Sequence, residues 1–323
     1  MEIEISVIVP TYQRPQLLLN CLRHLHRQTL DREKYEVIIV SDGPDMMAKQ
    51  IVAEYKACSS FNVKFLSLAC KQGPAAARNL GWKNASGILI AFTDDDCLPD
   101  KMWLENILSH YDKQSEIAFT GKVIVPVSDK PTDFELNTKG LETGDFVTAN
   151  CACTKAALEA TGGFDEAFTT AWREDSDLEF KLINRKVPII KLHDAVVVHP
   201  VRQAPWGVSV KEQRKAMFNA LLFKKYPGLF RDRVRRGPTW RYYLIILFLI
   251  VFLVSLFLRF ELLAIIGFTG WLYLTIAFIN KRLRATRKTF SHISEMIATS
   301  LVIPFLSVYW TIFGAIKYRV LFL

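Results

Sequence analysis

The sequence predicts an α/β domain with a mostly parallel sheet flanked by helices, followed by transmembrane or interfacial helices. From residue 5 to about 117, short apolar segments alternate with segments of helical period, which is typical of parallel βαβ units. Beyond residue 240, long apolar runs alternate with Lys and Arg clusters, which is typical of membrane helices. We therefore expect an α/β domain at residues 1–235 and a membrane domain at residues 236–323.

The first half of the α/β domain has the clearer pattern. In its first helix, Leu18, Leu22 and Leu25 recur at helical spacing. Strands are predicted at 5–10, 36–41, 63–68 and 88–92, and helices at 14–28, 46–57 and from Gly73 onward. After residue 117 we expect strands at 117–127, 146–154, 188–190 and 195–198, a polar loop at 129–143, and helices at 155–161 and 173–184.

Two apolar runs, 242–258 and 262–279, are predicted to span a membrane. The first is roughly 26 Å long as a helix, which is enough for a bilayer core. Only Arg259, Phe260 and Glu261 separate the two runs, so we expect a tight hairpin. Basic clusters precede and follow the pair, and the positive-inside rule places them on the cytoplasmic side. The first residues have no signal-peptide pattern, so we expect the α/β domain to face the cytoplasm at the inner membrane.

A third apolar segment, 296–316, has two interpretations. As a spanning helix it would leave Lys317 and Arg319 on the far side. As a kinked, re-entrant or interfacial segment it would keep both charges inside, with Tyr309 and Trp310 at headgroup level. The charge rule favours the second interpretation.

Composition excludes some classes of partner. Lys and Arg number 41 against 32 Asp and Glu, and the excess lies largely in the second half. We interpret it as membrane topology, because neither a ribonucleoprotein pattern nor zinc-finger spacing accompanies it. No nucleic acid partner is expected. The six scattered cysteines are expected to be reduced thiols and do not form a disulfide framework.

The most informative motif is an acidic triplet, Asp94, Asp95 and Asp96, directly after the apolar strand 88–92. Ligands of open α/β sheets bind at the carboxyl ends of the strands. Hard divalent cations such as Mg²⁺ or Mn²⁺ prefer oxygen ligands and share them with substrate phosphates. The alternative is a solvated turn in which Asp serves as a helix cap.

Six motifs in order resemble glycosyltransferase family 2. They are Ser6–Tyr12, Val40–Gly43, Gly73–Asn79, Phe92–Asp96, Gly162–Glu166 and Arg173–Leu178. The resemblance covers residues 3 to about 200. It implies a GT-A fold, a nucleotide-sugar donor, a divalent metal and inversion at the sugar.

The resemblance also implies a donor site. Pro10, Thr11 and Tyr12 would line the base pocket, and Asp42 would accept a hydrogen bond from the base, although a turn-forming role is the alternative. Ser41 stands where the family usually has a further acidic residue. The guanidinium of Arg78 would approach the nucleotide, and a surface salt bridge is its alternative.

For the metal, the resemblance implies a D-x-D motif. Asp96 would ligate the ion, Asp94 would contact the ribose or support the ion, and Asp95 stays unassigned between these duties. His199 would be a further ligand or a structural histidine. Whether Mg²⁺ or Mn²⁺ binds is left open.

On the acceptor side, the resemblance makes Asp175 the general base. Glu174 would support it or act only as a favourable charge at a helix N-terminus. Trp172 would form a wall of the acceptor site, or lie in the core, and Asn150 would lie near the sugar. The Gln-x-x-Arg-Trp motif of processive synthases is missing, so one sugar per encounter is expected.

The resemblance and the apolar runs together predict a membrane-anchored inverting glycosyltransferase, whose nucleotide sugar the resemblance implies to be UDP-linked. Its acceptor would be a hydroxyl of a lipid-linked glycan or a polysaccharide at the cytoplasmic membrane face. A polyprenyl-phosphate glycosyltransferase and a non-catalytic membrane scaffold are the alternatives. The sugar, the acceptor and the oligomeric state are not determined by the sequence.

Overall fold

The computed structural model describes residues 3–58 and 61–322. The chain divides into two compact units, which we describe separately. The first contains the residues up to 126 and residues 139–201, and the second contains residues 127–138 and 202–323. The second unit begins before the compositional boundary at 235, because residues 202–235 form short helices that pack with the apolar helices. Residues 1 and 2, which belong to the N-terminal segment that has no signal-peptide pattern, lie outside the described residues.

The first unit contains an eight-stranded mixed sheet in the order β3-β2-β1-β4-β7-β6-β8-β5. Its strands are β1 (Ile5–Thr11), β2 (Tyr35–Ser41), β3 (Val63–Ser67), β4 (Leu89–Phe92), β5 (Leu98–Pro99), β6 (Ala118–Ile124), β7 (Cys151–Thr154) and β8 (Ile189–Val198). The first four are parallel, β6 is parallel to β8, and β7 and β5 run antiparallel to their neighbours. The predicted mostly parallel sheet is confirmed.

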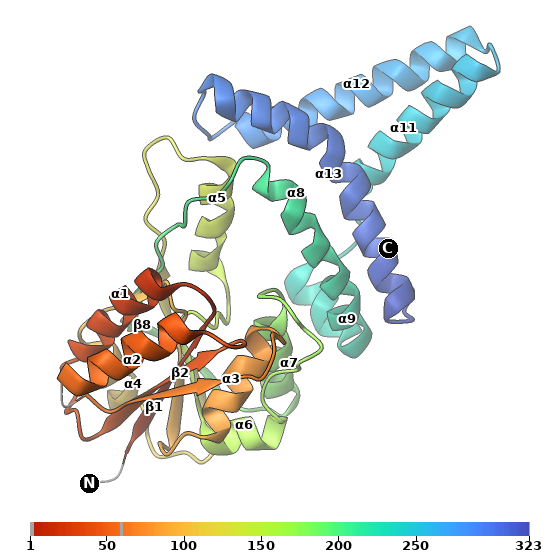
Figure 1. The fold of residues 1–323 in the computed structure, drawn as a ribbon. Helices are drawn as coiled ribbons and strands as arrows, with labels where there is room; N and C mark the ends of the chain where they lie inside the picture. The colour runs from red at the N-terminus through yellow and green to blue at the C-terminus, as the bar shows by residue number, and fades with distance from the viewer. Residues whose placement is uncertain (1–2, 59–60, 323) are drawn as a thin grey trace. The chain divides into compact units, whose positions relative to one another are not determined.

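Helices cover both faces of this sheet (Figure 1). On one face lie α1 (Pro15–His26), α2 (Met46–Cys58) and α4 (Trp103–Ser109); on the other lie α3 (Pro74–Lys83), α6 (Lys155–Thr161) and α7 (Glu174–Asn184). Successive β1 side chains enter different cores, with Val7 and Val9 facing the first set and Ile8 the second. Because both faces are covered, β1 is apolar almost throughout, as expected of a buried parallel strand.

The later elements differ in part from the prediction. The polar loop expected at 129–143 contains α5 (Asp133–Lys139) and the 3₁₀ helix η1 (Gly140–Thr143). A capping box starts α5, in which Glu135 accepts from the Thr132 backbone and Thr132 accepts from the Glu135 backbone. The two strands expected at 188–190 and 195–198 are one continuous strand, β8. Of the segment 146–154, only Cys151–Thr154 is strand.

The strand order reverses beside β1. The chain builds β2 and β3 on one side of β1 and then returns to place β4 on the other side. Open α/β sheets bind ligands at such a switch point, outside the carboxyl ends of the strands. Here those ends are Thr11 on β1 and the acidic triplet after β4.

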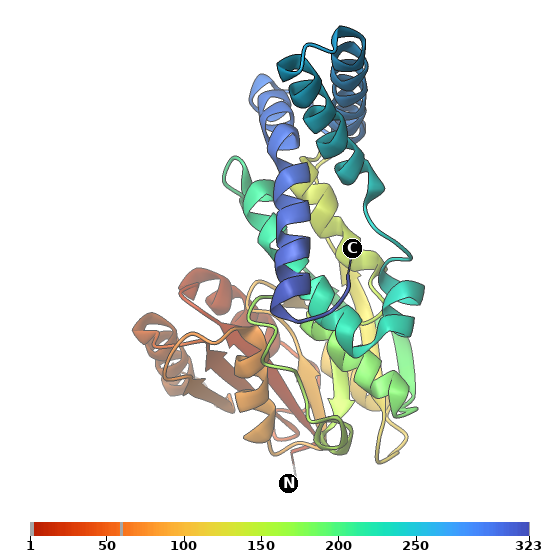
Figure 2. The same cartoon turned by 90° about the vertical axis from the view of Figure 1, so that its right-hand side faces the viewer.

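In the second unit, α11 (Trp240–Phe257) and α12 (Glu261–Leu283) run side by side (Figures 1 and 2). Three residues connect them, as the predicted hairpin requires. A side chain at Gly267 would lie 2.5 Å from the backbone nitrogen of Phe252, and one at Gly270 would lie 2.6 Å from the Phe248 ring. Small residues therefore allow the close helix contact, as is common between membrane helices.

The other large helix of this unit is α13 (Phe290–Lys317), which contains the predicted segment 296–316. It carries Pro304 inside and bends along its course (Figure 1). α11, α12 and α13 are each long and apolar enough to cross a membrane. Short helices precede the hairpin: α8 (Val208–Glu212), η2 (Gln213–Ala216), α9 (Met217–Lys225), α10 (Pro227–Leu229) and η3 (Phe230–Val234).

A buried arginine joins four segments of the second unit. Arg282, in the last turn of α12, is 8% exposed and donates through Nη2 to Asp133 at 2.7 Å. Its Nη2 also donates to the Ser209 hydroxyl on α8. Its Nη1 donates to Thr299 and Ser300 on α13, at 2.7 and 3.0 Å. The arginine therefore connects the segment 127–138 to the apolar helices.

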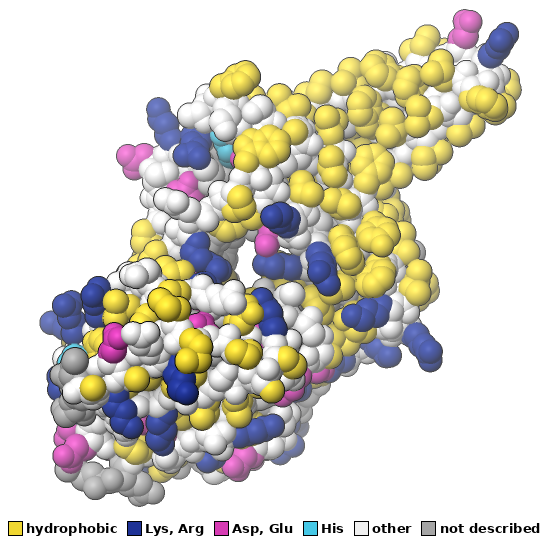
Figure 3. Space-filling view, in the orientation of Figure 1, with side chains coloured by type: hydrophobic (Ala, Val, Ile, Leu, Met, Phe, Trp, Pro, Cys, Tyr) yellow, Lys and Arg dark blue, Asp and Glu magenta, His cyan; other side chains and the backbone are white. Residues whose placement is uncertain are grey.

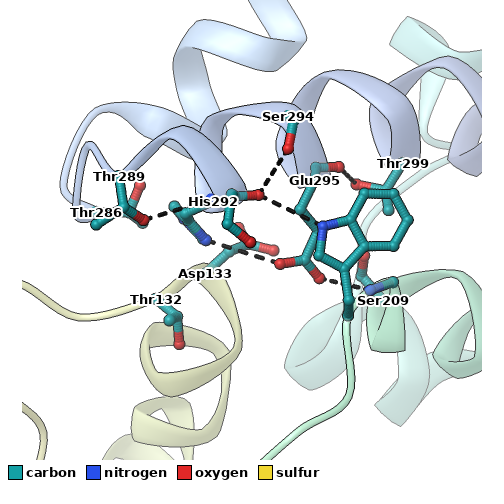
Figure 4. A network of polar contacts seen from close by, with 12 residues as sticks. Thr132, Asp133, Ser209, Thr286, Thr289, His292, Ser294, Glu295 and Thr299 are labelled. Atoms are coloured by element: carbon teal, nitrogen blue, oxygen red, sulfur yellow. Dashed lines mark hydrogen bonds and ion pairs between the residues drawn. The ribbon is translucent and has the colours of Figure 1, made fainter.

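A second polar contact lies at the start of α13 (Figure 4). The Glu295 carboxylate accepts from the Gly207 backbone at 2.7 Å and lies 3.8 Å from the ring of the buried His292. The Trp206 indole donates to the carbonyl of Ser291. Together with Arg282, these contacts fix the chain before α8 along the first turns of α13.

We expect Asp133→Ala to destabilise the second unit. The substitution leaves a nearly buried cation without its carboxylate partner, and we expect a loss of about 1–3 kcal/mol, since Asp133 itself is partly exposed. The measurement is the thermal unfolding midpoint of the full chain in detergent.

The matched control is Asp129→Ala, which removes the same charge from an exposed position of the same segment. The double variant Asp133→Ala/Arg282→Met should lose less stability than the sum of the two single variants. Equal midpoints for Asp133→Ala and Asp129→Ala would contradict the role given to the ion pair.

Candidate functional site

The triplet after β4 separates into three environments. Asp95 is fully buried and accepts a hydrogen bond from the Thr11 hydroxyl at 2.7 Å. Its Oδ2 also lies 3.2 Å from Nε of Arg14, at the start of α1. Burial raises the pKa of Asp95 to about 7, although Arg14 and Thr11 favour its ionised form. These contacts give Asp95 the role of joining the ends of β1 and β4.

Asp94 points the other way, toward Arg78. Nη2 of Arg78 donates to Asp94 at 2.7 Å, and Nη1 donates to Glu174 at 3.2 Å. Burial acts to raise the pKa of Asp94, but Arg78 and other nearby cations outweigh it, so the pKa is below its usual value. Asp94 is 27% exposed, and Arg78 is only 2% exposed.

Arg78 is buried, so the alternative of a surface salt bridge is wrong. Its approach to the nucleotide stays a prediction. Arg78 bridges two carboxylates in the interior, because α3 presents it between the end of β4 and the start of α7. Its charge balances part of the acidic cluster.

The predicted metal ligands lie together. Asp94, Asp96 and His199 each offer a ligand atom, and with Cys97 these atoms lie within 4.8 Å of one another. Nε2 of His199 is 3.7 Å from Asp96. Nδ1 of the same ring is buried and has no hydrogen-bond partner among the described residues. Two carboxylates and an imidazole suit a hard or borderline divalent cation, so these residues fit the expected ion.

Cys97 also lies in this group. Its thiol is fully buried beside the acidic residues. Burial, and the nearby Asp94 and Asp96 carboxylates, raise its pKa well above the usual range. Sulfur ligands suit softer metals than Mg²⁺ or Mn²⁺, so we count only the two carboxylates and the imidazole as ligands for such an ion.

The acidic pair at the start of α7 has unequal surroundings. Glu174 is 3% exposed and contacts Arg78, whereas Asp175 is partly exposed. Burial and the neighbouring Asp175 raise the pKa of Glu174 to about 7, against the effect of Arg78. Burial also raises the pKa of Asp175. One Asp175 oxygen accepts from the backbone of Ser176 at 2.6 Å.

The residue before this pair adopts an uncommon backbone. Arg173 has φ +75°, in the left-handed region that side chains other than glycine rarely enter. Its guanidinium lies over the Trp172 ring, 4.7 Å from the centroid. Trp172 is 37% exposed, so it belongs to the surface beside Asp175 and its alternative placement in the core is wrong.

The predicted base pocket gathers at the ends of β1 and β2. The Thr11 hydroxyl donates its hydrogen bond to Asp95, as described. Tyr12 is half-buried, and Lys71 lies over its ring at 4.2 Å from the centroid. Oδ1 of Asp42 accepts from the backbone of Gln72 and Gly73, at 2.7 and 2.8 Å. Asp42 thus fixes the loop before α3.

Asn150 makes structural hydrogen bonds, and its position near the sugar stays a prediction. Its amide nitrogen donates to the carbonyls of Lys122 and Ala195, and its oxygen accepts from the Trp103 indole. The side chain is 1% exposed. It joins β6, β8 and α4 where a turn leads into β7.

Two residues at the site were not predicted from the sequence. Arg14 follows the Pro10–Tyr12 motif, and only the contact with Asp95 reveals its role. Cys97 directly follows the triplet, and this adjacency is the sequence feature from which its place at the site could have been predicted. The predicted reduced state of the cysteines agrees with free thiols at Cys21, Cys70, Cys97, Cys151 and Cys153. The side chain of Cys58 lies outside the described residues.

Comparison with known proteins places these features in a family. Residues 6–160 match the model of glycosyl transferase family 2. Glycosyltransferase AglE of Haloferax volcanii is 27% identical over 218 residues, which cover 65% of this chain and 70% of that relative. Validoxylamine A glucosyltransferase of Streptomyces hygroscopicus subsp. jinggangensis is 26% identical over 276 residues. This match covers 71% of the chain and 62% of the relative, less than two thirds of its length.

Solved structures with the same fold include two glycosyltransferases. The mannosyltransferase PcManGT of Pyrobaculum calidifontis, in complex with GDP-Man and Mn²⁺, has a TM-score of 0.56 at 16% identity, over 99% of this chain and 88% of that one. TarS residues 1–349 of S. aureus, in complex with UDP-GlcNAc, has a TM-score of 0.51 at 17% identity, over 98% and 92%. Residues 6–160 therefore form a glycosyl transferase family 2 domain, and the eight-stranded sheet, which extends to β8, has the GT-A fold.

Proposed function

We propose that this protein is a membrane-anchored, metal-dependent inverting glycosyltransferase. It transfers one sugar from a nucleotide sugar, preferably UDP-linked, to a hydroxyl of a lipid-linked or polysaccharide acceptor at the cytoplasmic membrane face. One observation carries the proposal. The ligand atoms of Asp94, Asp96 and His199 cluster at the switch point of the sheet, and Arg78 connects Asp94 to the acidic pair that contains Asp175.

The donor half of the proposal rests on this cluster. Asp96 and His199, with Asp94, would hold Mg²⁺ or Mn²⁺. When bound, such an ion neutralises charge on the departing diphosphate. The neighbouring strand ends supply Tyr12, a flat ring for a base, and Asp42, a hydrogen-bond acceptor. Arg78 serves as a positioning residue that keeps the donor and acceptor sides at a fixed separation.

The acceptor half rests on Asp175, which is partly exposed while Glu174 is held by Arg78. The acceptor oxygen attacks the anomeric carbon from the face opposite the leaving group. Its proton passes to the Asp175 carboxylate, and the bond from the anomeric carbon to the diphosphate oxygen breaks. The nucleoside diphosphate leaves with that electron pair. One displacement inverts the anomeric centre, so one base suffices.

The comparisons support the substrate classes in outline. The complexes of PcManGT with GDP-Man and of TarS with UDP-GlcNAc support a nucleotide-sugar donor, and Mn²⁺ in the first supports a metal. The relatives are named for transfer to poly(ribitol-phosphate) and to validoxylamine A, which supports a hydroxyl-bearing acceptor.

The membrane attachment rests on the helical hairpin. α11 and α12 expose most of their apolar side chains and carry basic residues before and after the pair. This arrangement supports two spanning helices with the catalytic unit on the cytoplasmic side. Contacts of α13 with α8 and α9 support the interfacial interpretation of that helix. A tethered enzyme meets a membrane acceptor at high effective concentration.

We expect Asp175→Asn to reduce transfer by about 10²–10⁴-fold, because the acceptor hydroxyl loses its base. Affinity for the nucleotide sugar should remain within about two-fold, since Asp175 lies on the acceptor side. Single-turnover transfer and donor titration measure the two effects. The control is Glu159→Gln, the same change at an exposed position on α6.

The pH dependence gives a second measurement on the same residue. Asp175 must be ionised to accept the proton, and its pKa is raised, so the rate should fall with acidification at a higher pH than an ordinary aspartate allows. Full activity of Asp175→Asn on a hydroxyl acceptor would remove the base assignment. Activity of that variant on polyprenyl phosphate, which is already ionised, would favour the polyprenyl-phosphate alternative.

We expect Asp96→Ala to abolish Mn²⁺- or Mg²⁺-dependent binding of the nucleoside diphosphate. The variant removes a carboxylate from the ligand cluster, whereas Asp112→Ala changes an exposed aspartate of the same unit and serves as control. Isothermal titration with UDP and GDP, with and without each ion, tests the site and the donor together. Unchanged titration by Asp96→Ala would reject the ligand assignment. Failure of the wild-type protein to bind any nucleotide sugar would favour the scaffold alternative.

A further inference from the structure

One face of α13 is apolar and exposed. Its buried positions are mostly small or polar: His292, Met296, Thr299, Ser300, Ile303, Pro304, Thr311 and Gly314. Its exposed large apolar positions are Phe290, Ile297, Leu301, Val302, Phe305, Tyr309, Ile312, Phe313 and Ile316. A water-facing helix shows the opposite pattern, with polar residues outside. The outer face of α13 therefore suits an apolar environment.

The opposite face of α13 and the residues after it pack against the helices before the hairpin, α9, η2 and η3, which leaves the apolar face of α13 exposed. At Gly314, an added side chain would lie 2.5 Å from the Met217 carbonyl oxygen, so the two helices touch through their backbones. The guanidinium of Arg214 lies over the Trp310 ring, at 5.7 Å from the centroid. The Phe322 ring packs against Phe230 at 5.4 Å. The C-terminal half of α13 thus lies along the polar helices that precede the hairpin.

Those preceding helices are strongly basic. Residues 202–241 contain 11 Lys and Arg against 2 Asp and Glu, an excess equal to the formal charge of +9 of the whole chain. The exposed cations include Lys211, Arg214, Lys224, Arg231, Arg233, Arg236 and Arg241. Figure 3 shows yellow apolar side chains continuing from the hairpin over α13, with dark-blue side chains gathered where this surface ends.

Two large aromatic side chains of this unit are exposed. Trp240, at the start of α11 and next to the basic residue Arg241, is 65% exposed, and Tyr309 on α13 is 56% exposed. Trp and Tyr are enriched at headgroup level because one end of the ring is apolar and the other polar. An apolar face, exposed aromatic side chains and a basic flanking segment are together typical of a helix lying in a membrane interface.

We propose that the apolar face of α13 and the basic residues of 211–241 form one surface that lies on a membrane leaflet, where the basic residues bind anionic phospholipid headgroups. The inference rests on the proposed membrane attachment, since the surface continues from the hairpin that would span the bilayer. Charge complementarity selects the occupant, because basic segments beside a membrane attract anionic lipids. A second copy meeting this surface about a two-fold axis would bring a second set of the same basic residues into the interface, without adding acidic partners.

The test compares lipids that differ only in headgroup. The full chain, in a mild nonionic detergent, is titrated with fluorescent phosphatidylglycerol and with fluorescent phosphatidylcholine. We expect phosphatidylglycerol to bind at least about five-fold more tightly, since each basic residue near the headgroups contributes roughly that factor. The preference should shrink at about 0.5 M NaCl, because salt screens exposed charges.

Two matched triple variants distinguish lipid binding by this surface from an effect of the net charge of the protein. Lys224→Glu/Arg231→Glu/Arg236→Glu should lose the preference, and Lys49→Glu/Lys56→Glu/Lys101→Glu, which reverses exposed charges of the first unit, should keep it. Thermal midpoints and UDP affinity should match the wild-type protein in both. These readouts need no transfer activity, so a retained lipid preference without any transfer would count against the proposed function alone.

Three results would overturn the proposal. They are equal affinity of the wild-type protein for both lipids, an equal loss of preference in the two triple variants, and a preference insensitive to salt. A dimer that dissociates in the first variant and forms without lipid would identify a second copy as the occupant.

Discussion

The buried bridge from Asp94 through Arg78 to Glu174 is the interaction on which the candidate site depends. It joins three elements that are far apart in sequence: the end of β4, the helix α3 and the start of α7. Without the arginine, the buried Glu174 and the partly buried Asp94 would lose their shared cation beside other acidic groups, which favours protonation or movement of at least one of them. The bridge therefore allows the acidic groups at the end of β4 and at the start of α7 to lie close together.

The sheet explains why these groups meet at all. β1 is the central strand at which the order reverses, so its carboxyl end lies beside that of β4. Thr11 and Arg14 engage Asp95 across this junction. With Asp95 held inside, Asp94 faces Arg78 and Asp96 lies beside His199. A single triplet thus supplies one carboxylate that joins two strand ends and two that belong to the candidate ligand cluster.

In the second unit, by contrast, buried polar contacts connect helices whose surfaces are mostly apolar. Arg282 and Glu295 anchor the segments 127–138 and 206–209 to the apolar helices, while the outer faces of those helices remain apolar. Both anchored segments continue covalently from strands of the site, since β6 ends at Ile124 and β8 at Val198. Buried polar contacts specify one arrangement of the helices, where apolar packing alone would permit several.

The sequence by itself determined the parallel strands, the acidic triplet and the apolar hairpin, because each depends on local periodicity or on adjacent residues. It could not determine that Arg78 and Asn150 are interior residues, since exposure depends on what packs from distant segments. It likewise missed α4 and the helices of 208–234, because such short runs give little helical periodicity to read from the sequence. The tertiary structure alone decided how the triplet divides, because its three environments come from β1, α3 and β8, which no local pattern connects.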